Sequence, residues 1–419
     1  MTKFNNSRKE DYFVYLSMFM LLLITFPLAI GWVGLGGFIP RAIYIVFIIV
    51  IKPNLFMRKD NIFLSLYFVY IIITDTEGEL AIILANYMEF LISLLLANYY
   101  LETRSKNQIL IARYAIIISV FIMINTILVN LSSPGIVRSM VGFSSQGAEE
   151  ESLYYIRMGV SGYAFAQISM CLAPVFLFMS KVTKYTNTKI LYFSLFLLVT
   201  YFVFITGITT CLIILLFMLV LYFANIKIIN ISKLLIVIII TSLVLYFIGL
   251  TVIEFLLPHF EGTTFYSHMG GLLEFYGKNT FANDIYNVED RVSSYQDSFG
   301  TFLSNPLFGS STGKNGGHNY FLDRLARVGI IGVAPLLIFM FYRFKAAFDI
   351  LSLRTKMLYF ICILGFLLLG SLKNLAGIDY WTYMFFYIPC ILKYGEMYRA
   401  NRLSIHKDDE NSIFISLHR

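Results

Sequence analysis

The sequence ILYFSLFLLVTYFVFITGITTCLIILLFMLVLYFA at residues 190–224 contains no charged side chain. A single helix of this length would extend about 50 Å, whereas the hydrocarbon core of a bilayer is about 30 Å thick. We therefore divide the stretch at its polar centre, residues 206–210, into two spans near residues 189–205 and 208–224. Two consecutive apolar helices of this length indicate a polytopic membrane protein.

The composition of the whole chain supports the same class. Of 419 residues, 58% are hydrophobic and 14% are charged, against roughly 45–50% and 25% in a soluble domain, which excludes a cytosolic globular enzyme. Every cysteine lies in an apolar run, where a thiol behaves as a small hydrophobe, so no disulfide framework or cysteine metal site is expected. These cysteines are Cys171, Cys211, Cys362 and Cys390. No cleavable signal peptide is predicted, since the first apolar run is of span length and lacks an A-x-A site.

Apolar runs of about 15 residues or more predict an all-α polytopic membrane protein with about twelve transmembrane helices. The expected spans lie near residues 12–30, 38–51, 61–74, 80–100, 109–130, 161–180, 189–205, 208–224, 234–255, 329–342, 357–372 and 378–392. Nine of them fall in residues 1–255, which include a medium outer loop at about 131–160, and three fall in residues 329–392. Residues 256–328 form a large outer loop, and residues 393–419 form a cytoplasmic tail.

Lysine and arginine determine the expected orientation, because cytoplasmic loops hold an excess of both. With the N-terminus inside, 23 of the 32 cationic residues lie on inner segments, including Arg343 after the tenth span, and nine lie on outer ones. Both termini are therefore expected in the cytoplasm. This membrane topology explains the formal charge of +7, so the expected partner is the lipid bilayer and no nucleic acid is needed.

The large outer loop is too aromatic for a disordered linker and should fold on the outer face. Within it, apolar side chains recur at helical spacing until Asn305 and Pro306 end the pattern, which predicts an amphipathic helix on the membrane surface. They are Val292, Tyr295, Phe299, Phe302 and Leu303. Residues 309–317 do not match a phosphate-binding P-loop, because only three residues separate Gly309 from Gly313 and asparagine replaces the serine or threonine. We expect a glycine-rich turn there.

His318 and Asn319 follow this turn, and residues 320–328 continue as a helix into the span that begins at Gly329. The positive end of a helix dipole disfavours the imidazolium form, which leaves a neutral imidazole able to act as a general base. A histidine at a helix start is also often a cap or a packed residue, so catalysis is one of two interpretations.

Three side chains of this helix lie on one side, at positions i, i+4 and i+7: Tyr320, Arg324 and Arg327. Together with His318 they indicate a site for a diphosphate or an anionic sugar. Asp323 offers an alternative explanation for Arg327, because an aspartate four residues earlier on a helix can form a local ion pair.

The order of these residues resembles the C-terminal signature of the O-antigen polymerase and O-antigen ligase superfamily. The resemblance is carried by Arg291, then Asn305-Pro306-Leu307-Phe308-Gly309, then Gly316-Gly317-His318-Asn319-Tyr320-Phe321-Leu322, then Gly329-Ile330-Ile331-Gly332. It covers about 45 residues. Elsewhere, the number of spans and the two long outer loops are compatible with the Wzy-type polysaccharide polymerases.

The resemblance implies a glycosyltransferase of polysaccharide biosynthesis in the bacterial cytoplasmic (inner) membrane, with its active site on the periplasmic face. The glycan could belong to the O-antigen of lipopolysaccharide or to a capsule. The enzyme would join undecaprenyl-diphosphate-linked oligosaccharides without a cofactor or metal, alongside a chain-length regulator and a flippase. In the superfamily, the histidine of the His-Asn motif is proposed as catalytic base and outer arginines as diphosphate ligands. Carried over by motif, this makes His318 the base and Arg291 a diphosphate ligand, with Arg324 as a further candidate.

The chain departs from the superfamily at an outer turn before a late span. Relatives often carry a Ser-Arg pair there, whereas residues 206–210 contain no arginine. Arg41, Arg138 and Arg157 are other outer cations that could complete a diphosphate site. They could equally bind lipid headgroups or the acidic residues 149–151.

Two other functions stay open. An O-antigen ligase, which transfers glycan to lipid A core, shares the His-Asn motif. A lipid-linked oligosaccharide flippase has about as many spans, but it should show two related halves and functional charges within the spans. Glu89, near the middle of the fourth span, is either functional or a neutral packing residue, and Asp75 and Glu77 are expected to be solvated instead of binding a metal.

Overall fold

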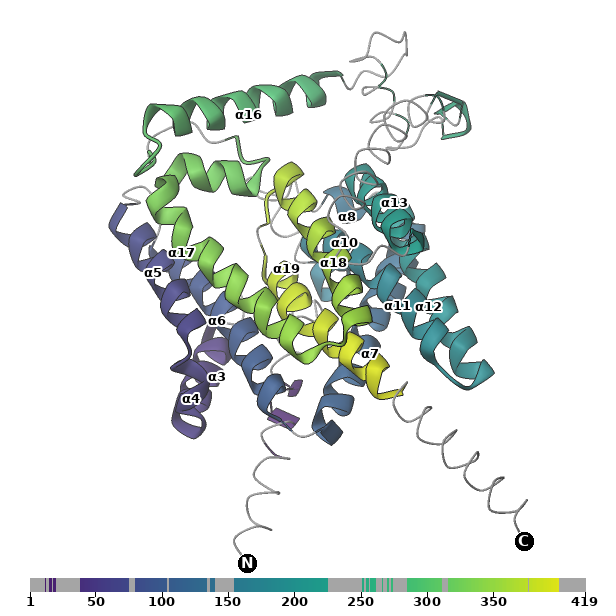
Figure 1. Ribbon diagram of the computed structural model, residues 1–419. Helices are drawn as coiled ribbons and strands as arrows, with labels where there is room; N and C mark the ends of the chain where they lie inside the picture. Colours follow the sequence, from purple (N-terminus) through teal and green to yellow (C-terminus); the bar gives the residue numbers. More distant parts are fainter. Residues whose placement is uncertain are drawn as a thin grey trace, which may run out of the picture.

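The computed structural model describes residues 38–74, 80–103, 105–133, 136–139, 154–224, 257–260, 285–310, 316–375 and 377–398, with isolated positions outside them. All regular secondary structure in these ranges is helical (Figure 1). Among the described residues, five helices are long and apolar enough to cross a membrane: Ser105–Ser132, Tyr163–Val182, Thr186–Ile205, Tyr320–Ile350 and Leu353–Leu372. The all-helical class is thus confirmed for the described residues. The number of twelve spans and their orientation stay predictions.

The elements are, in chain order, α3 (Phe38–Ile51), α4 (Pro53–Phe56), α5 (Lys59–Thr74), α6 (Leu80–Glu102), α7 (Ser105–Ser132), α8 (Ile136–Ser139), α10 (Tyr163–Ile168), η3 (Ser169–Cys171), α11 (Leu172–Val182), α12 (Thr186–Ile205), α13 (Thr209–Phe223), η4 (Leu257–Phe260), α16 (Ile285–Ser304), α17 (Tyr320–Ile350), α18 (Leu353–Leu372), α19 (Ile378–Thr382) and the π-helix η5 (Tyr383–Tyr387). The last helix continues to residue 398. In Figure 1, α16 lies across one end of the bundle, over the first part of α17.

The apolar stretch at residues 190–224 is divided where the sequence predicts. α12 ends at Ile205 and α13 begins at Thr209. Gly207, between them, has a φ of 66°, a left-handed conformation that glycine adopts at little steric cost. The Nδ2 of Asn130, on α7, donates a hydrogen bond to the carbonyl oxygen of Ile205 at 3.1 Å. A carbonyl at the end of α12 thereby gains a partner from another helix.

α19 and η5 occupy the centre of the bundle, where the side chains of residues 380–387 are almost fully buried. Their polar groups find partners on neighbouring helices. Thr382 Oγ1 lies 2.7 Å from Ser93 Oγ on α6, and the hydroxyl of Tyr383 lies 2.7 Å from Ser119 Oγ on α7. Buried hydroxyls of this kind hold helices together where no water is available to bond them.

Pro389 shapes the hydrogen bonding after η5, because proline has no N–H to donate. In the i to i+5 pattern of a π-helix, the residue at position 389 would donate to the carbonyl of Met384. The hydroxyl of Tyr359, on α18, donates to that carbonyl instead, at 2.8 Å. A tyrosine on a second helix therefore replaces the missing backbone donor.

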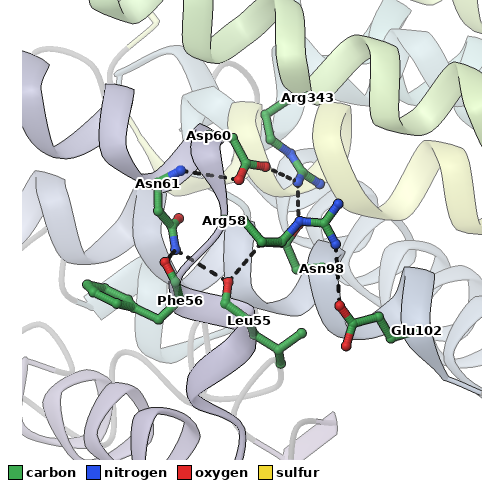
Figure 2. Close-up of polar contacts among 8 residues, drawn as sticks. All are labelled: Leu55, Phe56, Arg58, Asp60, Asn61, Asn98, Glu102 and Arg343. Carbon is green, nitrogen blue, oxygen red and sulfur yellow. Dashed lines mark hydrogen bonds and ion pairs between the residues drawn. The ribbon is translucent and has the colours of Figure 1, made fainter.

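The expected inner loop at residues 343–356 is mostly helix, because α17 continues to Ile350. Arg343, which the charge pattern places in that loop, is instead a buried residue of α17 and is 2% exposed. Its Nη1 donates to Asp60 Oδ2 at 2.8 Å and to Asn98 Oδ1 at 2.5 Å (Figure 2). Arg343, which the charge pattern assigns to a cytoplasmic loop, thus links α17 to α5 and α6 by buried hydrogen bonds.

Replacing Arg343 by methionine should destabilise the protein by about 3–5 kcal/mol, because the carboxylate of Asp60 would stay buried without its partner. Adding Asp60→Asn should recover part of the loss. Arg58→Ala is the matched control, since Arg58 and Glu102 form an exposed pair at 3.4 Å that contributes at most about 1 kcal/mol. Thermal unfolding of the purified protein in detergent measures all three variants. Equal melting temperatures for Arg343→Met and Arg58→Ala would contradict the role assigned to Arg343.

Candidate active site

α17 begins at Tyr320, and Asn319 is its N-cap residue. The side-chain Oδ1 of Asn319 accepts a hydrogen bond from the N–H of Leu322 at 3.0 Å, and the N–H of Asn319 donates to Asp323 Oδ2 at 3.1 Å. This reciprocal pair satisfies groups at the helix start that have no partner within the helix. His318 is half-buried and directly precedes the cap. Its predicted position at the start of the helix is therefore confirmed.

Asp323 also joins α17 to α16. Its Oδ1 accepts a hydrogen bond from Ser298 Oγ at 2.6 Å, and Ser298 Oγ accepts one from the N–H of Gly316 at 2.9 Å. Gly316 lies so close to α16 that a Cβ there would overlap both the side chain and the backbone of Ser294. The loop that carries His318 is thereby fixed against α16. Both carboxylate oxygens of Asp323 accept hydrogen bonds in this bridge, which goes beyond the local ion pair considered from the sequence.

α17 is broken at Gly329, whose φ of 63° and ψ of −175° lie outside the helical region. In a continuous helix the N–H of Ile330 would donate to the carbonyl of Ala326. Here it donates to the carbonyl of Pro306 at 2.9 Å, while the carbonyl of Ala326 accepts from the N–H of Ser310 at 2.9 Å. The segment around Pro306 therefore enters the hydrogen-bond ladder of α17. The prediction that residues 320–328 continue as one helix into the span beginning at Gly329 is therefore wrong, because the backbone leaves the helical region at Gly329.

Gly309 and Gly329 make this contact possible. Both have positive φ values, 76° and 63°. A Cβ on Gly309 would overlap the backbone of Arg327, and a Cβ on Gly329 would overlap the backbone of Leu307. Before the contact, Asn305 Nδ2 donates to the carbonyl of Gly309 at 2.7 Å, which closes the turn. We name residues 294–310 and 316–331 the α16–α17 junction.

The α16–α17 junction is attached to the bundle at both of its sides. The hydroxyl of Tyr70, on α5, donates to the carbonyl of Phe308 at 3.3 Å. The N–H of Tyr320 donates to the carbonyl of Lys373, just after α18, at 3.2 Å. Contacts with α5 and with the end of α18 therefore set the position of the loop that carries His318.

Arg291 lies on the side of α16 that meets this loop. It precedes Tyr295 by four residues, so the two side chains share one face of the helix, and the side chain of Arg291 is half-buried. Burial raises the pKa of Tyr295, and the nearby positive charge of Arg291 opposes that rise. One helical turn separates Arg291 from Ser294, which contacts Gly316. Arg291 therefore lies on α16 about one turn from the point where the loop of His318 contacts this helix.

Tyr320 and Arg324 face the packed interior. Tyr320 is 3% exposed, and its ring centre lies 5.7 Å from that of Trp381. The guanidinium carbon of Arg324 lies 5.3 Å from the ring centre of Tyr320, a geometry typical of cation–π contacts, and it interacts electrostatically with Tyr67 of α5. Arg327 is half-buried on the same helix. The side of α17 on which the sequence predicts an anion-binding site therefore faces buried aromatic residues in part.

The other predicted cations are described only in part. Arg157 is exposed. Arg41 and Arg138 lie in α3 and α8, but their side chains are outside the described residues, as are the side chain of Glu89 and residues 75–77. Among the side chains that are described, no three from histidine, cysteine, aspartate and glutamate lie close enough together to hold a metal ion.

Ser294 and Ser298 are the residues of this site that the sequence analysis missed. They stand at i and i+4 on α16 and provide the surface against which Gly316 packs. Two small polar side chains on the same face of an amphipathic helix are the signal that marks such a contact, because they leave room for a backbone to approach. The hydrogen-bond partner of Ser298, Asp323, could not be assigned from spacing alone.

No protein-family model matches this chain, and no curated protein matches it significantly. The resemblance to the polymerase and ligase superfamily therefore rests on the quoted residues themselves. In the α16–α17 junction, several of these residues make a hydrogen bond or a close backbone contact that requires their residue type: Asn305, Gly309, Gly316, Asn319 and Gly329.

Gly329→Ala should cost about 1–3 kcal/mol from overlap with the backbone of Leu307. A further ~1–3 kcal/mol should come from the backbone conformation, a positive φ with an extended ψ that essentially only glycine adopts. Gly300→Ala is the matched control, because Gly300 lies within α16 and an added Cβ would meet nothing within 4 Å. Alanine there should stabilise the helix by up to about 1 kcal/mol. Thermal unfolding in detergent measures both changes. Equal melting temperatures for the two variants would show that Gly329 is not needed for the close contact between α17 and the backbone of Leu307.

Proposed function

We propose that this protein is a polysaccharide polymerase, a glycosyltransferase that joins undecaprenyl-diphosphate-linked oligosaccharide repeat units at the outer face of the bacterial cytoplasmic membrane. The setting of His318 carries this proposal. His318 directly precedes the N-cap of α17, and its loop is bonded to the side of α16 that bears Arg291. A base and a cation on adjoining segments are the groups that transfer from a diphosphate carrier requires.

In the proposed reaction, a hydroxyl group of the incoming repeat unit attacks the anomeric carbon of the growing glycan. The bond from that carbon to the diphosphate oxygen breaks, and a new glycosidic bond forms. His318 takes the hydroxyl proton, and the departing diphosphate keeps the electron pair of the broken bond. The positive end of the α17 dipole favours the neutral imidazole, which is the form that accepts a proton.

The departing diphosphate gains negative charge, which fixed guanidinium groups stabilise without reorganising. Arg291 is the first ligand in this proposal, because it lies one turn from the contact between Ser294 and Gly316. Arg324 is the second proposed ligand. Its guanidinium lies against the ring of Tyr320 at the start of α17. Further proposed substrate contacts are Arg327, Asn319, Tyr320, Arg41, Arg138 and Arg157.

His318→Ala in the chromosomal gene should leave an inserted protein that makes no polymer, so that single repeat units reach the final acceptor. The measurement is fractionation of the cell's glycans by size, by carrier and by side of the membrane. His259→Ala, which changes another histidine of the large outer loop, is the control and should retain long polymer. Long polymer on the final acceptor in the His318→Ala strain would rule out His318 as the base.

The same fractionation separates the two other functions. Long polymer that stays on undecaprenyl diphosphate at the outer face would indicate an O-antigen ligase. Repeat units retained at the cytoplasmic face would indicate a lipid-linked oligosaccharide flippase. In the second case His318 would have no catalytic role, since a flippase makes and breaks no glycosidic bond.

A further inference from the structure

An apolar corner is exposed where the end of α16 leads into the segment that packs against α17. The exposed fractions of its side chains are 59% for Leu303, 53% for Leu307 and 56% for Phe308. Single exposed apolar residues are ordinary on protein surfaces, whereas several large ones together mark an interaction surface. We name these three residues the apolar corner.

The backbone of the apolar corner is bonded to the bundle, and its side chains are exposed. The carbonyl of Leu307 accepts a hydrogen bond from the N–H of Ile331 on α17, at 3.1 Å. The carbonyl of Phe308 accepts one from the hydroxyl of Tyr70 on α5, at 3.3 Å. Bonds to two packed helices therefore set the place of the exposed side chains.

The corner continues a surface that already faces lipid. α17 is long and apolar enough to cross a membrane, and along it Ile330, Leu337 and Phe341 are exposed. Exposed apolar side chains on a membrane-crossing helix face the hydrocarbon. Ile330 donates its N–H to the carbonyl of Pro306, next to Leu307 in the chain. The apolar corner is thus contiguous with the lipid-facing side of α17.

The sequence around the corner also lacks charge. Every residue between Asp297 and Lys314 is uncharged, although about 25% of the residues in a soluble domain are charged. At that average frequency, about four charged residues would be expected over such a length. Insertion among lipid headgroups and acyl chains explains both the missing charge and the exposed apolar side chains.

We infer that the apolar corner inserts into the interfacial region of the adjacent lipid leaflet and anchors the α16–α17 junction to the bilayer. The partner is the lipid surface itself. This anchor rests on exposure, backbone contacts and charge, and it does not require the proposed reaction. Combined with that reaction, it would hold the loop of His318 at the depth of the headgroups, where a lipid-linked diphosphate lies.

Site-directed spin labelling of the full-length chain tests the anchor. A nitroxide is attached at Leu307→Cys or Phe308→Cys and, as the matched control, at Asp297→Cys, which is an exposed position of α16. The four native cysteines are buried and should react little with the label. The labelled proteins are reconstituted in vesicles of phosphatidylcholine and phosphatidylglycerol. Electron paramagnetic resonance then measures how often each label collides with oxygen and with a water-soluble nickel chelate.

Oxygen concentrates in the bilayer, whereas the nickel chelate stays in water. We expect collisions with oxygen to exceed those with nickel at positions 307 and 308, and the reverse at position 297. Collisions dominated by nickel at positions 307 and 308 would overturn the inference. Protection from both reagents would overturn it as well, because protein, such as a second copy of the chain, would then cover the corner. Labelling two adjacent positions keeps the test decisive if one variant fails to fold.

Discussion

The backbone of α17 breaks at Gly329. The N–H groups of Ile330 and Ile331, which follow the break, therefore have no acceptor in the preceding part of the helix. The carbonyls of Pro306 and Leu307 accept them, at 2.9 and 3.1 Å. An unbonded backbone group near a bilayer costs several kcal/mol. The segment that follows α16 is therefore required at this position.

The rest of the α16–α17 junction depends on this requirement. Once residues 305–310 occupy the break, α16 must lie over the first part of α17, as Figure 1 shows. Asp323 then reaches Ser298 on α16, and Ser298 holds Gly316. The loop before the Asn319 cap is thereby bound from two sides. A general base needs such a fixed position, because proton transfer depends on distances of about 3 Å.

Patterns within one segment were predictable from the sequence, and contacts between distant segments were not. The turn at residues 206–210 and the helix start at Tyr320 follow from local apolar runs and polar residues. The break at Gly329 is not predicted, because it depends on the distant backbone of Pro306 and Leu307. Arg343 was placed in a loop because charge patterns favour surface positions. Its partner Asp60 lies 283 positions away in the chain, and no local sequence pattern predicts a contact at that distance. The burial of Tyr320 depends likewise on a distant residue, Trp381.

A double-mutant cycle between Ser298→Ala and Asp323→Ala tests most directly whether the bridge between α16 and α17 holds the loop of His318. The free energy of unfolding would be measured for both single variants and the double variant in detergent micelles. Residues that share a hydrogen bond should show a coupling energy of about 0.5–3 kcal/mol. We predict a value in this range, because the accepting group is a carboxylate. Strictly additive effects would contradict the bridge and remove the support for the position of His318.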